Sequence, residues 1–349
     1  MNTIIYQDYL QVKTQNPDIH TRDLASLLGI TEAELLYCRV GHEQTQRLSD
    51  NVVEILGMLS SIGSAKAITR NDCAVIVQTG QYDNAKLHHH AGLFLNPRKL
   101  DLRMFFAQWD SVFTVTEETK TGLRHSIQFF DKYGDALHKI YATEQTNMDA
   151  WQNIITLYSS TENPPLSLDK ASPFLETEIS AELTQQVEQQ WRDMKDVHQF
   201  FTILKNNNLN RQQAFRIVSR DLAWQVPTHS LSTLLAQAHQ AQNEIMLFVS
   251  NRGCVQIFTG KINQPSCLTT QSTLTNWLSI SNTNMNLHII ENEIDECWVT
   301  RKPTKDGFVT SLEVFDKQGN QILQMYGQRT EGAPEQVEWC KQILALPHI

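Results

Sequence analysis

The sequence lacks an apolar run long enough to cross a membrane, and it lacks any cysteine pair with the spacing of a metal or redox site. No run approaches the roughly 18 residues that a membrane span needs. The N-terminus has neither the basic start nor the long apolar centre of a secretory signal. The six cysteines are scattered and form no CxxC motif. We therefore expect free thiols in a reducing cytoplasm and no stable membrane insertion.

Positive charge is also scarce, since 29 Lys and Arg residues face 38 Asp and Glu residues, for a net charge of −9. A broad surface for nucleic acid or anionic lipid needs clustered positive charge, so we expect no nucleic-acid partner. A local basic pocket for a small anion stays open. The sequence contains no Walker A loop, no GxGxxG after a strand, no HExxH and no GxSxG. These absences argue against the corresponding nucleotide, dinucleotide, zinc-protease and serine-hydrolase sites.

What the 349-residue chain does contain is an internal repeat. At a constant offset of 185 residues, Phe130-Asp131-Lys132 falls on Phe315-Asp316-Lys317. Further coincidences at the same offset are Leu102 with Leu287, Asp110 with Asp295, Gly122 with Gly307, Ser126 with Ser311, Gly134 with Gly319, and Tyr141 with Tyr326. Upstream the match continues at an offset of 180, with Asn71 on Asn251. Self-similarity at fixed spacing indicates a duplicated structural unit.

Each repeat is predicted to begin with helices and continue as an antiparallel sheet. Residues 21–37 read as two short helices split at Gly29, and Thr31 with Glu34 has the spacing of a capping box. Later segments are short, β-branched and aromatic, and the sequences DKYG and DKQG predict turns between the third and fourth strands. Helices near Trp151 and Trp339 are expected to close the two repeats.

These patterns predict an α+β fold made of two tandem repeats related by a pseudo-two-fold. The polar, proline-bearing stretch 159–173 is unpatterned and reads as a linker. The expected domains are therefore an N-terminal repeat at 1–158, the linker at 159–173, and a C-terminal repeat at 174–349.

The duplication allows the two halves to be compared with each other. His198 falls on Tyr9, Lys302 on Glu117, and Arg329 on Glu144. The C-terminal half thus has three basic or imidazole side chains where the N-terminal half has neutral or acidic ones. A basic pocket with one histidine suits a dianionic ligand that also binds an imidazole.

His198 extends an apolar helical stripe that is expected across 180–204, through Leu183, Val187, Trp191 and Met194 to Phe201. One interpretation is a core histidine with a satisfied hydrogen bond. The other is an imidazole that faces a flat apolar cofactor, where its neutral nitrogen is a good iron ligand.

Other candidate sites have competing interpretations. The helix pair at 21–37 resembles a DNA-binding motif, but its second helix opens with two glutamates, which favours a packing role. The His88-His89-His90 run would bind a metal only from a loop. The segment Arg301–Thr304 reads either as a solvated hairpin rim or as an anion clamp. Tyr326 reads either as core or as part of a site.

Taken together, these segments resemble the bacterial haem-trafficking and haem-degrading proteins of the HemS and ChuS type. The resemblance covers nearly the whole chain and rests on its combination of segments: RDLASLLGITEAELL, LFLNPRKLDLRMFF, DVHQFF, NRQQAF, NRGCVQIFTG, MNLHI, WVTRKPTKDGFVTSLEVFD and YGQRTEG. It departs from the family at Phe258, where relatives often carry histidine, and at Met285, where phenylalanine is usual.

The resemblance implies one haem b, held mainly by the C-terminal half. It implies that His198 is the proximal iron ligand and that Arg103 is a distal arginine from the N-terminal half, so that both would take part in catalysis. Phe105 would lie over the porphyrin. The polar lining of the family pocket would be formed by Arg211, Lys302, Tyr326 and Arg329, of which the three cations are candidates to pair with the propionates.

The resemblance supports two functions, of which degradation is the expected one and carriage the alternative. The first is haem degradation in a haem-oxygenase-like reaction that releases iron and draws on an external reductant. The second is a carrier that sequesters haem and delivers it to a separate haem oxygenase. A haem-responsive regulator that uses residues 21–37 is a third, weaker interpretation. An inner-membrane haem transporter and a haem oxygenase are the expected transient partners.

Overall fold

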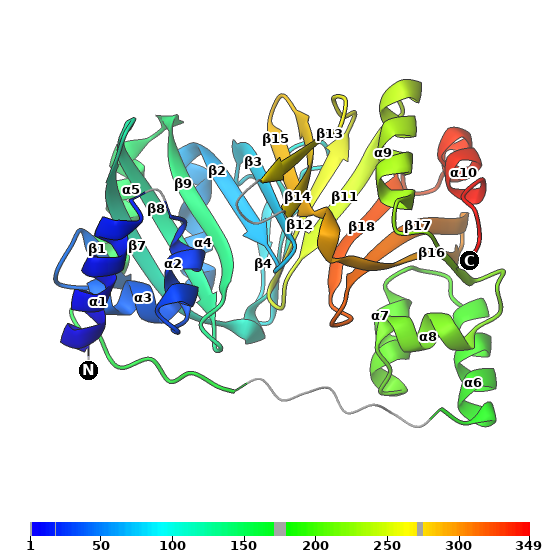
Figure 1. The fold of residues 1–349 in the computed structure, drawn as a ribbon, viewed down its shortest axis with the longest axis horizontal. Coiled ribbons are helices and arrows are strands. Elements are labelled where there is room, and N and C mark those ends of the chain that lie inside the picture. The colour runs from blue at the N-terminus through cyan, green and yellow to red at the C-terminus, as the bar shows by residue number, and fades with distance from the viewer. Residues whose placement is uncertain (1, 18, 171–178, 271–274) are drawn as a thin grey trace. The chain divides into compact units, whose positions relative to one another are not determined.

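A computed structural model describes residues 2–17, 19–170, 179–270 and 275–349 (Figure 1). The chain forms two compact units. Unit 1 comprises Met1–Arg70, Val77–Ser172 and Asn251–Gln256, and unit 2 comprises Asn71–Ile76, Pro173–Ser250 and Ile257–Ile349. Each unit therefore contains a short segment from the other half of the chain, a feature that the sequence comparison did not predict.

Unit 1 begins with helices and continues as an antiparallel sheet. Its helical elements are α1 (Asn2–Gln15), α2 (Thr21–Leu27), α3 (Glu32–Arg39), α4 (Val52–Met58), η1 (Leu59–Ile62), η2 (Phe106–Gln108) and α5 (Met148–Tyr158). Its main strands run in the order β1 (Thr45–Leu48), β7 (Trp109–Thr119), β8 (Gly122–Asp131), β9 (Ala136–Thr146) and β2 (Gly63–Arg70). A smaller antiparallel group contains β6 (Asp101–Phe105), β5 (Ala91–Phe94) and β4 (Ala85–Leu87).

Unit 2 repeats this plan. Its helical elements are α6 (Ala181–Arg192), α7 (Gln199–Asn206), α8 (Arg211–Ile217), α9 (Ser230–Ala241), η3 (Glu291–Glu293) and α10 (Val337–Leu344). Its main strands run in the order β10 (Ala223–Val226), β16 (Ile294–Thr304), β17 (Gly307–Asp316), β18 (Gln321–Gly327) and β11 (Ile245–Ser250). The smaller group contains β15 (Met285–Ile290), β14 (Thr275–Asn282) and β13 (Ser266–Thr270). The remaining strands, β3 (Ala74–Gln81) and β12 (Cys254–Gly260), each contribute residues to both units.

Strand register confirms the duplication. Ser126 pairs with Tyr141 in unit 1, and Ser311 pairs with Tyr326 in unit 2. The register shift between Trp109 and Ser111 recurs 185 residues later between Ile294 and Glu296. Because even the irregularities of the two meanders coincide, the repeat is structural. The α+β class with antiparallel sheets is confirmed.

Local signals in the sequence also predicted element boundaries well. Gly29, at φ 66°, separates α2 from α3, and the capping box of Thr31 and Glu34 opens α3. Gly134 and Gly319 both take positive φ in the two predicted turns, and each donates its N–H to the aspartate three residues earlier. Asp131 and Asp316 are thus the turn residues of matching hairpins.

The expected continuous helical stripe across 180–204 is wrong. Helix α6 ends at Arg192, and α7 begins at Gln199. Met194 is still buried in the core that α6–α8 form with Trp298 and Phe315, so the apolar spacing continues through a turn that is not helical. The break matters because His198 lies at its end.

The helices of unit 2 cover its sheet in two groups (Figure 1). Helices α6, α7 and α8 pack together on β16 and β17, around Trp191, Phe200 and Phe215. Helices α9 and α10 belong to a separate core with Leu312, Val314 and other buried residues of β16–β18. The first group positions the candidate site.

Candidate functional site

His198 lies in the turn that leads into α7, as the residue immediately before the helix. Its side chain is 89% exposed. His198 therefore does not lie on a buried stripe. It is also not a core histidine with a satisfied hydrogen bond, which was the alternative interpretation. Phe201, the other residue expected on the stripe, is 68% exposed, whereas its neighbour Phe200 is buried. The exposed imidazole and the exposed phenyl ring, three residues apart in the sequence, are both accessible to a ligand.

The ring of His198 is tied to Asp196. The imidazole Nδ1 lies 2.6 Å from an Oδ1 of Asp196, and the backbone N–H of His198 donates to the same oxygen over 2.8 Å. This backbone hydrogen bond is the main reason why the pKa of Asp196 is lower than usual. Since the ionised carboxylate only accepts hydrogen bonds, Nδ1 carries a proton, and in the neutral form of the ring Nε2 then has a lone pair for a ligand. Among the described residues, none hydrogen-bonds to Nε2.

Beneath α7 is a buried cluster centred on Glu313 of β17. Its carboxylate accepts hydrogen bonds from Arg211 at 2.9 Å and from Lys302 at 2.7 Å, and it is fully buried. Gln321 and Gln324 also donate to it. Burial opposes ionisation, but these partners together lower the pKa of Glu313 to about 2. Glu313 is thus a permanent buried anion at neutral pH.

Two of the predicted cations lie over Phe200 as a result. The Lys302 ammonium lies 4.9 Å from the centre of the Phe200 ring, and the Arg211 guanidinium lies 5.5 Å from it. Both geometries are within the range of cation–π attraction. Because Phe200 is two residues beyond His198 in sequence, the cluster anchors the start of α7.

The predicted cations differ in how available they are to a ligand. The Lys302 side chain is only 3% exposed, its ammonium is bound to Glu313 and Thr300, and burial lowers its pKa. Arg211 and Arg329 retain 29% and 27% of their side-chain exposure. Arg329 lies 3.8 Å from an Oδ2 of Asp306, and its charge contributes to the lowered pKa of Asp196. Arg211 and Arg329 are therefore better placed than Lys302 to pair with a bound anion.

Tyr326 is half-buried on β18, opposite Ser311 in the neighbouring strand. Its ring packs edge-on against Phe248 at 5.1 Å between centroids. Burial raises the pKa of its hydroxyl, and the charge of Glu313 contributes in the same direction. The structure thus brings Arg211, Lys302 and Tyr326 together around Glu313, and places Arg329 near the His198–Asp196 pair.

Unit 1 carries the two remaining predicted residues. Arg103 lies on β6, forms an ion pair with Asp101 and donates to the carbonyl of Leu102. Phe105 ends the same strand with 48% of its surface exposed, and its N–H donates to Gly253. An exposed phenyl ring close in sequence to a partly exposed guanidinium is available for a flat ligand.

The part of unit 1 that matches the His198 region has the opposite arrangement. Tyr9, the counterpart of His198, is buried, and the Arg39 guanidinium lies 5.3 Å from the centre of its ring. Arg39 is in turn paired with Glu43 at 2.7 Å and with Glu117, the counterpart of Lys302, at 3.0 Å. The charges of this cluster are satisfied internally, and it holds no imidazole in place of Tyr9.

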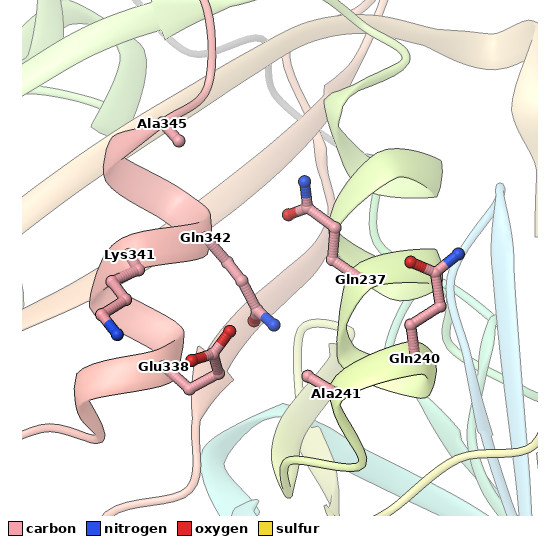
Figure 2. A pocket seen from close by; sticks show the side chains of 7 residues that line it. All are labelled: Gln237, Gln240, Ala241, Glu338, Lys341, Gln342 and Ala345. Carbon is pink, nitrogen blue, oxygen red and sulfur yellow. The ribbon is translucent and has the colours of Figure 1, made fainter.

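Other candidate sites gain no support. His88, His89 and His90 lie at an exposed turn between β4 and β5, and the described residues contain no group of three potential metal ligands. A surface groove between α9 and α10 is lined by polar side chains such as Gln342, which is hydrogen-bonded to Asn243 (Figure 2). This groove contains none of the predicted residues. No described helix is long and apolar enough to span a membrane.

Sequence reasoning missed Glu313 and Asp196. Glu313 falls on Gln128 of the first repeat, so the comparison of the two halves contained a neutral-to-acidic difference that pointed to it. Asp196 precedes His198 by two residues, a spacing at which an aspartate accepts a hydrogen bond from the backbone. Glu313 was harder to find, because its partner Arg211 lies about a hundred residues away in the sequence.

Comparison with known proteins decides the family. The family model described as the haemin-degrading HemS/ChuX domain matches residues 29–158 and again residues 208–346. The chain belongs to this family. The two matches agree with the duplication read from the sequence, and the predicted resemblance is confirmed.

Members of the family resemble this chain over its full length. It is 54% identical to the haemin transport protein HmuS of Yersinia pestis and 54% identical to the haemin transport protein HemS of Yersinia enterocolitica, with 99% of this chain and 98% of each relative covered. The haem-degrading enzyme ChuS of Escherichia coli O157:H7 superposes with a TM-score of 0.91 at 49% identity, covering 99% of both chains. Haem-bound PhuS, a haem-binding protein of Pseudomonas aeruginosa, superposes with a TM-score of 0.92 at 30% identity over 100% of both chains.

Proposed function

We propose that this protein binds one haem b in the cytoplasm through Nε2 of His198 and degrades it in a haem-oxygenase-like reaction that releases iron for use. The observation that carries this proposal is the exposed His198, whose Nδ1 is bound to Asp196 and whose Nε2 is left for a ligand. Full-length relatives that bind, transport or degrade haem support it. The haem would be the substrate of the reaction, and an external reductant would supply the electrons.

The residues around His198 fit a haem in three respects. A neutral imidazole nitrogen is a good ligand for iron. Phe201 offers an exposed apolar surface on the same helix as the His198 turn, which suits the flat porphyrin. Arg211 and Arg329 keep partly exposed side chains whose guanidinium groups would pair with the propionates, since arginine binds carboxylates through charge-assisted hydrogen bonds.

Lys302 and Tyr326 have a supporting role in this proposal. Lys302 shares Glu313 with Arg211 and thereby limits the positions that Arg211 takes. Tyr326 keeps its proton at neutral pH, as an ordinary tyrosine does, and burial raises its pKa further, so its hydroxyl can donate a hydrogen bond.

Arg103 and Phe105 complete the proposal from unit 1. The guanidinium of Arg103 has only hydrogen-bond donors and would donate to a group on the distal side of the porphyrin. Asp101 holds its guanidinium in place. Phe105 would lie over the ring. The support for these two roles is the family resemblance together with the exposure of both side chains.

A haem carrier is the second candidate function, and the haemin transport proteins among the relatives favour it. In that function the same residues would hold haem for delivery to a separate haem oxygenase, and an inner-membrane transporter would supply it. The two functions differ in whether haem is consumed while it is bound.

The ligand assignment is tested by His198→Ala. We expect the variant to lose the spectrum of imidazole-ligated ferric haem and to bind haem at least tenfold more weakly, because a first ligand to the iron is removed. Titration followed at the Soret band measures both. Arg192→Ala is the control, since Arg192 lies at the end of α6 and is paired only with Glu188 and Asp221 among the described residues. An unchanged spectrum and affinity in His198→Ala would overturn the assignment.

Degradation and carriage are separated by supplying haem, a reductant and dioxygen to the wild-type protein. An open-chain tetrapyrrole and free iron that form in the presence of catalase support the enzyme. Products that disappear when catalase is added arise from free peroxide, and they support the carrier instead.

A further inference from the structure

The segment between α6 and α7 contains a second functional residue besides His198. The Oδ1 of Asp196 accepts two hydrogen bonds from His198, one from the backbone N–H and one from the ring Nδ1. A single carboxylate oxygen thus fixes the position of the ring relative to the backbone at the start of α7. Asp196 is not part of the buried Glu313 cluster, and its side chain is 60% exposed.

The geometry of Asp196 is itself maintained by α7. The side-chain oxygen of Gln199 accepts hydrogen bonds from the backbone N–H groups of Lys195 at 2.7 Å and Asp196 at 3.1 Å. Gln199 is the first residue of the helix, so the turn is held at both ends. The helix is anchored in turn by the buried ring of Phe200. The carboxylate is therefore presented by an ordered turn, although it is exposed.

We propose that Asp196 is a positioning residue for haem binding, which holds His198 in the tautomer that leaves Nε2 free and aims that nitrogen at the iron. This inference rests on the proposed ligand role of His198. Histidines that bind metals commonly donate the other ring N–H to a carboxylate, which fixes the tautomer and raises the basicity of the ligating nitrogen. The contact is made by two residues of the same turn, so it would orient the ring toward the iron without help from any other element.

The contact would gain strength when a bound porphyrin covers it. In water, an exposed hydrogen bond of this kind contributes little to stability. A porphyrin bound at Nε2 would cover the ring and exclude water, and the same hydrogen bond would then act in a lower dielectric. We therefore expect the loss of Asp196 to affect haem binding more than it affects folding.

The test compares Asp196→Ala and Asp196→Asn with Asp193→Asn. Asparagine keeps an acceptor oxygen but loses the charge, whereas alanine loses both. Asp193 is a matched control, because it lies in the same exposed segment and bonds only to Gln189 through its side chain among the described residues. Nitrogen-15 spectra of the haem-free protein report the His198 tautomer directly.

We expect the wild type and Asp193→Asn to show His198 with a protonated Nδ1 and an unprotonated Nε2. In Asp196→Ala, the population with a protonated Nε2 should rise. Loss of a carboxylate that orients a ligand typically costs 10- to 100-fold in metal affinity, and we expect about tenfold weaker haem binding for Asp196→Ala, with a smaller loss for Asp196→Asn. The iron–histidine stretching frequency of the ferrous haem complex should fall in both variants and stay unchanged in Asp193→Asn.

The outcomes separate the two proposals. If His198→Ala abolishes imidazole ligation but the Asp196 variants keep the wild-type tautomer, affinity and stretching frequency, the positioning role is wrong and the ligand role stands. If His198→Ala leaves the haem spectrum unchanged, the ligand role fails. A change of tautomer in haem-free Asp196→Ala would then show only that the contact exists without serving haem.

Discussion

At the scale of single residues, both units bury titratable groups, but with different consequences. In unit 1, His138 is fully enclosed and lies 2.9 Å from the Thr69 hydroxyl and 2.8 Å from the Tyr82 hydroxyl. Among the residues that the structure describes, no carboxylate contributes to its pKa, and burial lowers that pKa to about 3. In unit 2, Glu313 is equally buried but is compensated by Lys302 and Arg211. The buried His138 therefore makes the stability of the fold sensitive to mild acid, whereas the paired Glu313 does not.

The sensitivity of His138 gives a prediction for pH dependence. Its folded-state pKa is depressed below the unfolded value near 6.5, so the unfolded chain binds an extra proton as the pH falls. Stability is therefore complete above pH 6.5 and decreases below it, by about 2 kcal/mol at pH 5. Urea unfolding of the wild type at pH 7 and pH 5 measures the total loss, to which other groups contribute.

The variant His138→Gln isolates this contribution. Glutamine can hydrogen-bond to the same hydroxyls but does not titrate, so the variant should lose less stability than the wild type between pH 7 and pH 5. His125→Gln is the control, because His125 is only half-buried and bonds to Thr116 at the surface. Equal pH dependence in all three proteins would contradict the prediction.

The sequence singled out candidate site residues by type, but it did not show their surroundings. The differences between halves singled out His198, Lys302 and Arg329 without a structure. They did not show that Lys302 is buried, because its partner Glu313 lies on the neighbouring strand and only the strand register brings them together. The role of a cation depends on what neutralises it, and that is a property of the fold.

At the scale of elements, the sequence predicted helix starts and turns correctly where only a few adjacent residues determine the backbone conformation. Positive-φ glycines and capping boxes depend on a few adjacent residues, so the turns at Gly134 and Gly319 and the start of α3 were predictable. The break between α6 and α7 was not, because Met194 stays buried and continues the apolar spacing through the turn. Hydrophobic periodicity indicates which residues are buried. A turn that buries an apolar residue at helical spacing therefore gives the same sequence pattern as a continuous helix.

Helix α8 provides an element-scale prediction, because it carries Arg211 and begins with a capping box of Asn210 and Gln213. Asn210→Ala should lower the free energy of unfolding by about 1 kcal/mol. Since Arg211 follows directly, the variant should also weaken haem binding. Thr31→Ala removes the corresponding cap of α3 in unit 1 and should cost similar stability without changing haem affinity. Urea unfolding and Soret titration measure the two effects, and an equal loss of affinity in both variants would argue against a site at α8.

At the scale of the whole molecule, the duplication preserved the scaffold and differentiated the chemistry. Strand register and bulges coincide between the repeats, whereas the region around Tyr9 has become internally satisfied. In place of His198 it has a buried tyrosine, and in place of Lys302 it has Glu117, which is paired with Arg39. The C-terminal half thus exposes His198 at the position where the N-terminal half buries Tyr9.

We therefore predict one tightly bound haem per chain. The matching region of unit 1 has no imidazole at Tyr9, its Glu117 is already paired with Arg39 and offers no cation, and Glu144 would repel the propionates. A Soret titration should reach its end point at one equivalent, and the stoichiometry should not change in Tyr9→Phe, which leaves the filled position intact. Two equivalent sites of similar affinity would contradict this view of the repeats.

The segments that each unit takes from the opposite half bear on the history of the gene. Asn71 accepts hydrogen bonds from the N–H groups of Cys73 and Ala74 and donates to Ser250, and its repeat counterpart Asn251 makes equivalent contacts with Cys254 and Arg70. Neither half of the coding sequence therefore specifies a complete unit. An ancestor half as long would have had to trade this segment with a second copy of itself. Two copies joined in one chain keep this exchange within a single molecule.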